Sequence, residues 1–338
     1  DGLSITKGDL TVKNLTMSGF SGNGVKSDGD GDVTLENVMI IGNERYGILA
    51  DGAVYINSDP LSNNVLSPTS TTTSVISGNG ASDDGGGVWS SKDSVSAAYV
   101  EIKDNKGAGV AAKKNIALEA FTISGNKGPG VQSLSGGISV YGTADHSEDN
   151  EVTENHGPGI MTGTDMELKQ IGSGKGKTKG SITIQTDVTV SKNGGWGVIA
   201  PEGDVAVNRV DATGDWGAVG SSTSVISDNG NTSLECYTLN DKGKLVRISA
   251  AALESAGAGG IGAGGNMAGA LLEVTGNNGP GIVAKNNVNL KQIMVNNNRG
   301  PGIQSRKSSI TINGTSDNSE ENQVMENQGP GMMSGTNM

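Results

Sequence analysis

Three aspartates at alternate positions form a stretch whose spacing suggests a metal site. Asp28, Asp30 and Asp32 are separated by single glycines. Carboxylates at alternate positions open many calcium loops, so the stretch predicts a Ca²⁺ site. The twelfth position of such a loop carries a bidentate glutamate, but here it is Met39. A solvated acidic turn that binds no metal explains the same residues, and no other cofactor is predicted.

Aromatic residues suggest a second kind of site, a platform for sugar rings. Tyr46, Trp196 and Trp216 each stand immediately before a glycine of a recurring turn. Trp196 and Trp216 are predicted on consecutive coils, where a pair of rings can bind a sugar, anchor an interface or form a purely structural stack. A second candidate face for a polysaccharide is formed by Asp83, Asp84 and Trp89.

The recurring turn reads Asn-x-Gly-Pro-Gly followed by an apolar residue. It contains five of the 8 prolines of the chain. A short period with one turn per repeat indicates a solenoid. In the turn that begins at Asn105, Ala108 replaces the proline. The turn asparagines are Asn105, Asn126, Asn155, Asn277, Asn298 and Asn327, and the glycines after proline are Gly130, Gly159, Gly281, Gly302 and Gly331.

The apolar residue that ends each turn marks one coil of an all-β parallel β-helix. Triplets such as Ile138–Val140 and Ile310–Ile312 place two apolar side chains on one face of a short strand. Coils stacked about 4.8 Å apart would align the turn asparagines in a hydrogen-bonded asparagine ladder. The twelve markers are Val25, Ile48, Val88, Val110, Val131, Ile160, Val198, Ala218, Ile261, Ile282, Ile303 and Met332.

A longer period relates the two halves of the chain. Val110 and Ile282 are 172 residues apart, and so are Val131 and Ile303. We therefore expect two tandem six-coil units, residues 1–172 and 173–338, in one continuous solenoid.

Two inserted loops distinguish these units. Ala50–Thr69 is inserted in the first and Gly230–Ala258 in the second. The second is expected to hold a hairpin around Asp241–Lys244 and a short helix over 249–257.

These coils resemble the right-handed parallel β-helix repeats of the pectin-lyase-like superfamily. The resemblance implies the fold, whereas activity depends on motifs that differ among its members. Of the polygalacturonase-like motifs, only Asp83-Asp84 has a counterpart here, and no arginine lies beside an aspartate cluster as in pectate lyases. In the second unit Asn318 replaces His146 and Gln328 replaces His156, and an amide cannot act as a general acid or base. No catalytic residue is predicted.

Composition narrows the expected location and partners. A net charge of -12 argues against nucleic-acid binding, and no apolar run is long enough to span a membrane. The sequence predicts a structural or adhesive segment of a long extracellular or cell-surface protein, such as a stalk, fibre or adhesin shaft. Its expected partners are further copies of itself, with a polysaccharide as a second candidate. The alternative is a carbohydrate-active or carbohydrate-binding β-helix.

Overall fold

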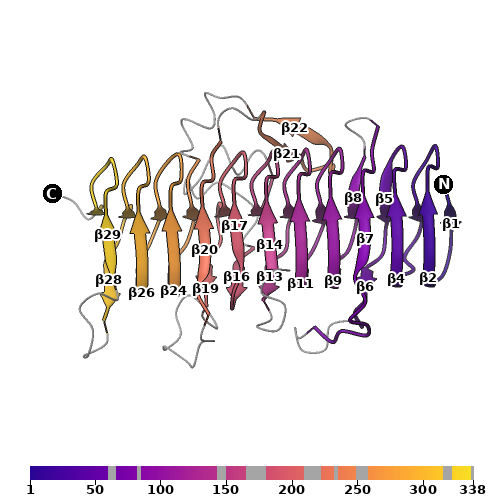
Figure 1. Cartoon of the computed structure of the whole chain (residues 1–338), viewed down its shortest axis with the longest axis horizontal. Helices are drawn as coiled ribbons and strands as arrows, with labels where there is room; N and C mark the ends of the chain where they lie inside the picture. Colours follow the sequence, from indigo (N-terminus) through magenta and orange to yellow (C-terminus); the bar gives the residue numbers. More distant parts are fainter. Residues whose placement is uncertain are drawn as a thin grey trace.

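The chain forms an elongated stack of β-strands in the computed structural model (Figure 1). The structure describes residues 1–59, 66–81, 85–142, 150–164, 180–208, 222–231, 235–248, 258–314 and 322–335. These ranges contain strands and turns only, as predicted. They hold no helix with the length and apolar character needed to cross a bilayer.

One sheet runs the length of the stack and takes one short strand from each coil; we call it the short-strand sheet. It is a 12-stranded sheet in the described residues, and every neighbouring pair is parallel. Its strands, in order, are β1 (Leu3–Ile5), β3 (Val25–Ser27), β5 (Tyr46–Ala50), β8 (Gly86–Ser90), β10 (Val110–Ala112), β12 (Val131–Ser133), β15 (Ile160–Thr162), β18 (Val198–Ala200), β23 (Ile261–Ala263), β25 (Ile282–Ala284), β27 (Ile303–Ser305) and β30 (Met332–Ser334).

The register of this short-strand sheet tests the predicted markers. Val110 pairs with Val131, and Val131 pairs with Ile160, which confirms that these markers lie on successive coils. The prediction is wrong at one point, because Val198 pairs directly with Ile261 and leaves no coil between them. Ala218, the predicted marker of that coil, lies outside the described residues.

A second sheet contains longer strands that bend in the middle. Its nine-residue strands have a residue with positive φ at the fifth position, such as Asn37 at 51° and Ala120 at 47°. This left-handed residue turns the strand through a corner without ending it, so two sides of the coil belong to one bent strand. The nine-residue strands are β2 (Leu10–Ser18), β4 (Val33–Ile41), β9 (Val95–Lys103), β11 (Ile116–Ser124), β24 (Met267–Thr275) and β26 (Val288–Asn296).

Other coils split the bent strand into two pieces at this corner. In the first coil of this kind, β6 (Val54–Ile56) pairs regularly with β4 and β9. The predicted insertion Ala50–Thr69 therefore starts too early, since the chain leaves the sheet only after Ile56. The split pairs are β6 with β7 (Ser74–Ser77), β13 (Ile138–Tyr141) with β14 (Asn150–Thr153), β16 (Ile182–Gln185) with β17 (Thr189–Ser191), β19 (Val205–Val207) with β20 (Ser224–Ser227), and β28 (Ile310–Asn313) with β29 (Gln323–Met325).

The second predicted insertion lies between β20 and β23. Within it, β21 (Tyr237–Leu239) and β22 (Leu245–Arg247) pair antiparallel, which confirms the hairpin around Asp241–Lys244. We call residues 235–248 the strap. The predicted helix over 249–257 lies outside the described residues.

A narrow apolar column fills the interior between the two sheets. Ile123, Val131 and Ile138 are at most 1% exposed and belong to one continuous cluster that runs through the stack. Because each coil contributes only a few apolar side chains, the fold forms with 33% hydrophobic residues. Backbone hydrogen bonds between coils satisfy the polar groups of the main chain.

Candidate functional site

The turn asparagines form a hydrogen-bonded ladder inside the stack. Both the backbone N and Nδ2 of Asn126 donate to Oδ1 of Asn155, at 3.1 and 2.9 Å. Asn126 Nδ2 also donates to Ile102 O at 3.1 Å. This pattern confirms the predicted asparagine ladder. Its members are Asn43, Asn79, Asn105, Asn126, Asn155, Asn193, Asn229, Asn277, Asn298 and Asn327.

Four ladder members were missed by sequence reasoning, because neither Gly-Pro-Gly nor the Gly-Ala-Gly of the Asn105 turn follows them. Asn43 and Asn193 nevertheless stand four residues before a glycine, Gly47 and Gly197, as the predicted members do. In the two remaining cases the turn is longer, so this spacing is lost. They are Asn79 and Asn229.

The second glycine of each turn is required by the ladder of the next coil. A Cβ on Gly130 would lie 2.5 Å from Val152 Cγ1 and 2.9 Å from Asn155 Nδ2. Gly331 has no such neighbour in the described residues, with the nearest atom 3.7 Å away. The same close approach to a ladder amide within 2.9 Å occurs at Gly159, Gly281 and Gly302. These asparagines and glycines therefore serve the fold.

The three aspartates of the predicted calcium site do not converge. Asp28 forms an ion pair with Lys26 at 2.6 Å, Asp30 is exposed, and Oδ1 of Asp32 accepts from Ala53 N at 3.0 Å. Among the residues that the structure describes, no group of three His, Cys, Asp or Glu side chains could hold a metal ion. The spacing along the chain was misleading because the glycines between the aspartates form a turn.

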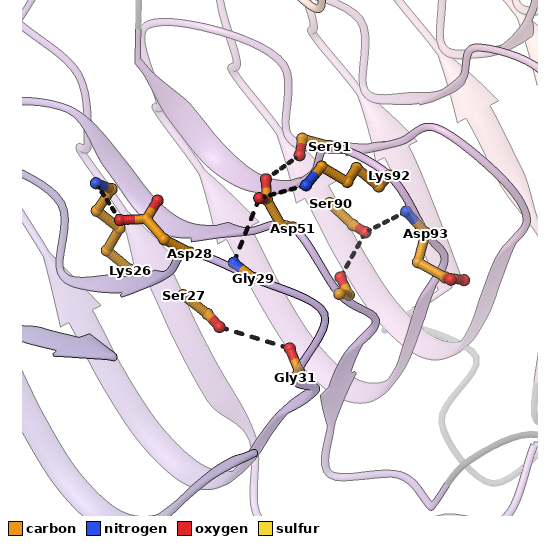
Figure 2. Close-up of polar contacts among 11 residues, drawn as sticks. Lys26, Ser27, Asp28, Gly29, Gly31, Asp51, Ser90, Ser91, Lys92 and Asp93 are labelled. Atoms are coloured by element: carbon orange, nitrogen blue, oxygen red, sulfur yellow. Dashed lines mark hydrogen bonds and ion pairs between the residues drawn. The ribbon is translucent and has the colours of Figure 1, made fainter. Parts of the chain in front are cut away.

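An adjacent carboxylate, Asp51, is held in place by three donors (Figure 2). Lys92 Nζ lies 2.8 Å from it, Ser91 Oγ donates at 2.5 Å, and Gly29 N donates at 3.4 Å. Partial burial alone would raise the pKa of Asp51. The hydrogen bonds from Lys92, Ser91 and Gly29 outweigh that effect, so its pKa is lowered. The negative charge is already neutralised by Lys92, so this cluster stabilises turns on neighbouring coils.

The strap covers the outer face of the short-strand sheet. Figure 1 shows β21 and β22 along one edge of the stack, displaced toward the N-terminal coils from the coil that carries β20. Gln132 makes the central contacts: its Oε1 accepts from Leu239 N at 3.0 Å and from Thr238 Oγ1 at 3.2 Å. Gln132 Nε2 donates to Leu239 O at 3.3 Å and to Gly163 O at 2.7 Å.

Apolar contacts anchor the strap at both ends. Toward its tip, Leu239 packs in a cluster with Trp89, Ala111 and Leu134. A Cβ on Gly243 would lie 2.5 Å from Trp89, so only glycine allows this approach. At its base, a separate cluster contains Cys236 and Ile248 of the strap. They pack with Met161, Ile199 and Val283 of the sheet and with Trp196 and Ala258 of the turns.

These contacts place the predicted aromatic residues under the strap. Trp89 is 7% exposed and Trp196 is 1% exposed, while Tyr46 is half-buried beside the Trp89 cluster. In this arrangement both indole rings are buried within the protein. Trp216, Asp83 and Asp84 lie outside the described residues, so the predicted stacking of Trp196 on Trp216 stays a prediction.

Charged residues surround the base of the strap. Lys127 Nζ lies 5.0 Å from the ring centre of Tyr237, Tyr237 Oη donates to Glu235 at 2.6 Å, and Arg247 pairs with Glu235 at 2.9 Å. His156 O accepts from Tyr237 N at 3.3 Å. Burial, followed by the charge of Lys127, lowers the pKa of His156, so it is predominantly neutral near pH 7. The charge of Lys127 over the ring of Tyr237 favours the docked strap.

The strap site could have been found from the middle residue of each short strand. These side chains point out of the β-helix and are expected to be polar when they face water. In most of the coils from Leu49 to Ile199 they are instead apolar, with Gln132 as the exception, and a covering segment explains why. The outward positions in this stretch are Leu49, Trp89, Ala111, Gln132, Met161 and Ile199.

Comparison with known proteins supports the fold. The family model described as "Right handed beta helix region" matches residues 1–172, half of the chain. No curated protein and no solved structure matches the chain. With parallel coils, inward apolar strands and an internal asparagine ladder, the chain belongs to the right-handed β-helix family.

Proposed function

We propose that this chain is a structural or adhesive segment of a long extracellular or cell-surface repeat protein, acting as a stalk, fibre or adhesin shaft. The observation that carries the proposal is the unbroken ladder, in which each asparagine from Asn43 to Asn327 bonds to the next. A solenoid with continuous internal hydrogen bonds resists extension and proteolysis, because each coil supports its neighbours.

The coils also continue across the boundary between the two predicted units. Ile138 pairs with Ile182, Ile160 pairs with Val198, and Asn155 bonds to Asn193, all across residues 165–179. We propose about twelve coils in two tandem units related by the 172-residue period. The units are unequal, because Val198 and Ile261 pair directly.

Lateral segments provide the adhesive part of the proposal. Segments of variable length leave the stack at the corner of the bent strands and in the turn after Asn229, whereas the coils themselves keep one register. Loops on a rigid scaffold are the usual place for partner contacts. Further copies of the chain are the partners we favour.

Two experiments test the proposed role. Antibodies against the folded chain should label intact cells of the source organism, and labelling only after permeabilisation would contradict a surface location. Incubation with acidic polysaccharides should produce no new reducing ends and no unsaturated products. Turnover of any such polymer would contradict a purely structural role and favour the carbohydrate-active alternative.

A further inference from the structure

The face beneath the strap has the properties of a peptide-docking groove. Its floor is the outer row of the short-strand sheet, from Trp89 through Gln132 to Met161. Toward the N-terminus the same row contains Ser4 and Lys26, which are polar. On this side, the row therefore becomes apolar where the strap begins to cover it.

Gln132 recognises main-chain atoms of its ligand. Its amide oxygen accepts from Leu239 N and its amide nitrogen donates to Leu239 O, as a neighbouring strand would do. A pocket with Trp89, Ala111 and Leu134 receives the Leu239 side chain. This combination fits an extended peptide that carries a leucine, with a glycine where the ligand turns against Trp89.

The strap can leave this groove without breaking the β-helix. Among the described residues, β21 and β22 pair only with each other. The ladder closes directly beneath the insertion, because Asn229 bonds to Asn277 at 3.1 Å through its backbone N and its Nδ2. The docked state also leaves Trp196 Nε1 buried without a hydrogen-bond partner. Undocking therefore costs the strap contacts alone.

We infer that the groove can accept the strap of a second copy of this chain in place of its own. The strap is the one segment seen to fit the groove in the described residues, and every copy carries it. It also enters with its turn first, since Gly243 at the tip contacts Trp89, so no chain end has to be threaded. The inference deepens the proposed structural role, because exchanged straps would join neighbouring molecules side by side.

The test uses two full-length variants with complementary defects. In the acceptor, residues 235–248 are replaced by a Gly/Ser linker of equal length, which leaves the groove empty. In the donor, Ala111→Arg places a long side chain in the groove floor and displaces the donor's own strap. Circular dichroism first establishes that both variants retain their β-structure. If Ala111→Arg prevents folding, the unmodified chain serves as donor after prolonged incubation.

Each variant alone should sediment as a monomer, and the mixture should sediment as a 1:1 complex. Cys236 supplies a second readout, because it is present only in the donor and is buried when the strap is docked. Its labelling by a thiol reagent should slow on addition of acceptor.

Gln132→Ala in the acceptor should weaken the complex about tenfold, since two hydrogen bonds to the ligand backbone are lost. The inference is overturned if the folded variants stay apart with unchanged Cys236 labelling, or if the Gln132→Ala acceptor binds equally well. Either result would leave the proposed surface location and the continuous β-helix unaffected, because each is tested by a separate experiment.

Discussion

Replacing Asn126 by alanine tests the asparagine ladder at a fully buried position. Asn126 is fully buried, and its Oδ1 accepts from both Asn105 N and Asn105 Nδ2, at 3.1 and 2.9 Å. The substitution leaves these donors without their partner. It also removes the hydrogen bond that Ile102 O accepts.

The expected cost follows from the number of groups left unsatisfied. A buried donor or acceptor without a partner costs about 1–3 kcal/mol. The two donors of Asn105 therefore predict a loss of about 2–6 kcal/mol in the free energy of unfolding. Folded domains are stable by roughly 5–15 kcal/mol, so the loss should be plainly measurable.

Urea unfolding followed by circular dichroism measures this loss, and amide exchange at Asn105 locates it. The matched control is Asn289→Ala, because Asn289 is only half-buried and accepts one hydrogen bond, from Asn313 Nδ2 at 3.2 Å. The control should cost less than about 1 kcal/mol. Equal stability of the two variants would refute the structural role of the ladder.

Three further substitutions test other parts of the account. Gly130→Ala should destabilise the chain and Gly331→Ala should not, because only the first Cβ would contact the next coil; equal unfolding midpoints would count against this. Ile138→Asp should lower the free energy of unfolding by several kcal/mol, because Ile138 points into the column. Ser139→Asp should lower it by only about 1 kcal/mol, because Ser139 faces outward. If Ser139→Asp is the more damaging, the strand faces are inverted. The lowered pKa of Asp51 predicts stabilisation that is present above the ordinary value of 3.8 and lost as pH falls through the folded value. Asp51→Asn should remove this part of the acid sensitivity, and an unchanged pH profile would argue against the ion pair.

Much of the scaffold could be predicted because it repeats. One turn motif located most coils, and the alternation at Ile138–Val140 identified the inward face correctly. The asparagine ladder followed from placing the same amide at the same point of each coil. The error at Ala218 arose because a glycine followed by an apolar residue resembled one more turn, although the register passes from Val198 to Ile261.

Features that depend on contacts between distant segments could not be predicted in the same way. The hairpin around Asp241–Lys244 was expected, but its destination was not, because the partners of Leu239 lie 107 residues away at Gln132. Trp89 and Trp196 looked like exposed platforms for the same reason. The left-handed corner at residues such as Ala120 was also missed, since alanine gives no local signal for positive φ.

Cutting the chain between residues 172 and 180 tests the central claim, that one β-helix runs through the whole molecule. A site-specific protease sequence placed there allows a single cut. Because the strap also links the two halves through Gln132, the cut should be made with residues 235–248 replaced by a Gly/Ser linker as well as in the intact chain. We predict that the cut halves stay together in both cases and sediment near the 34.1 kDa of the uncut chain until denaturant is added. Separation of the halves without denaturant would contradict a continuous rod.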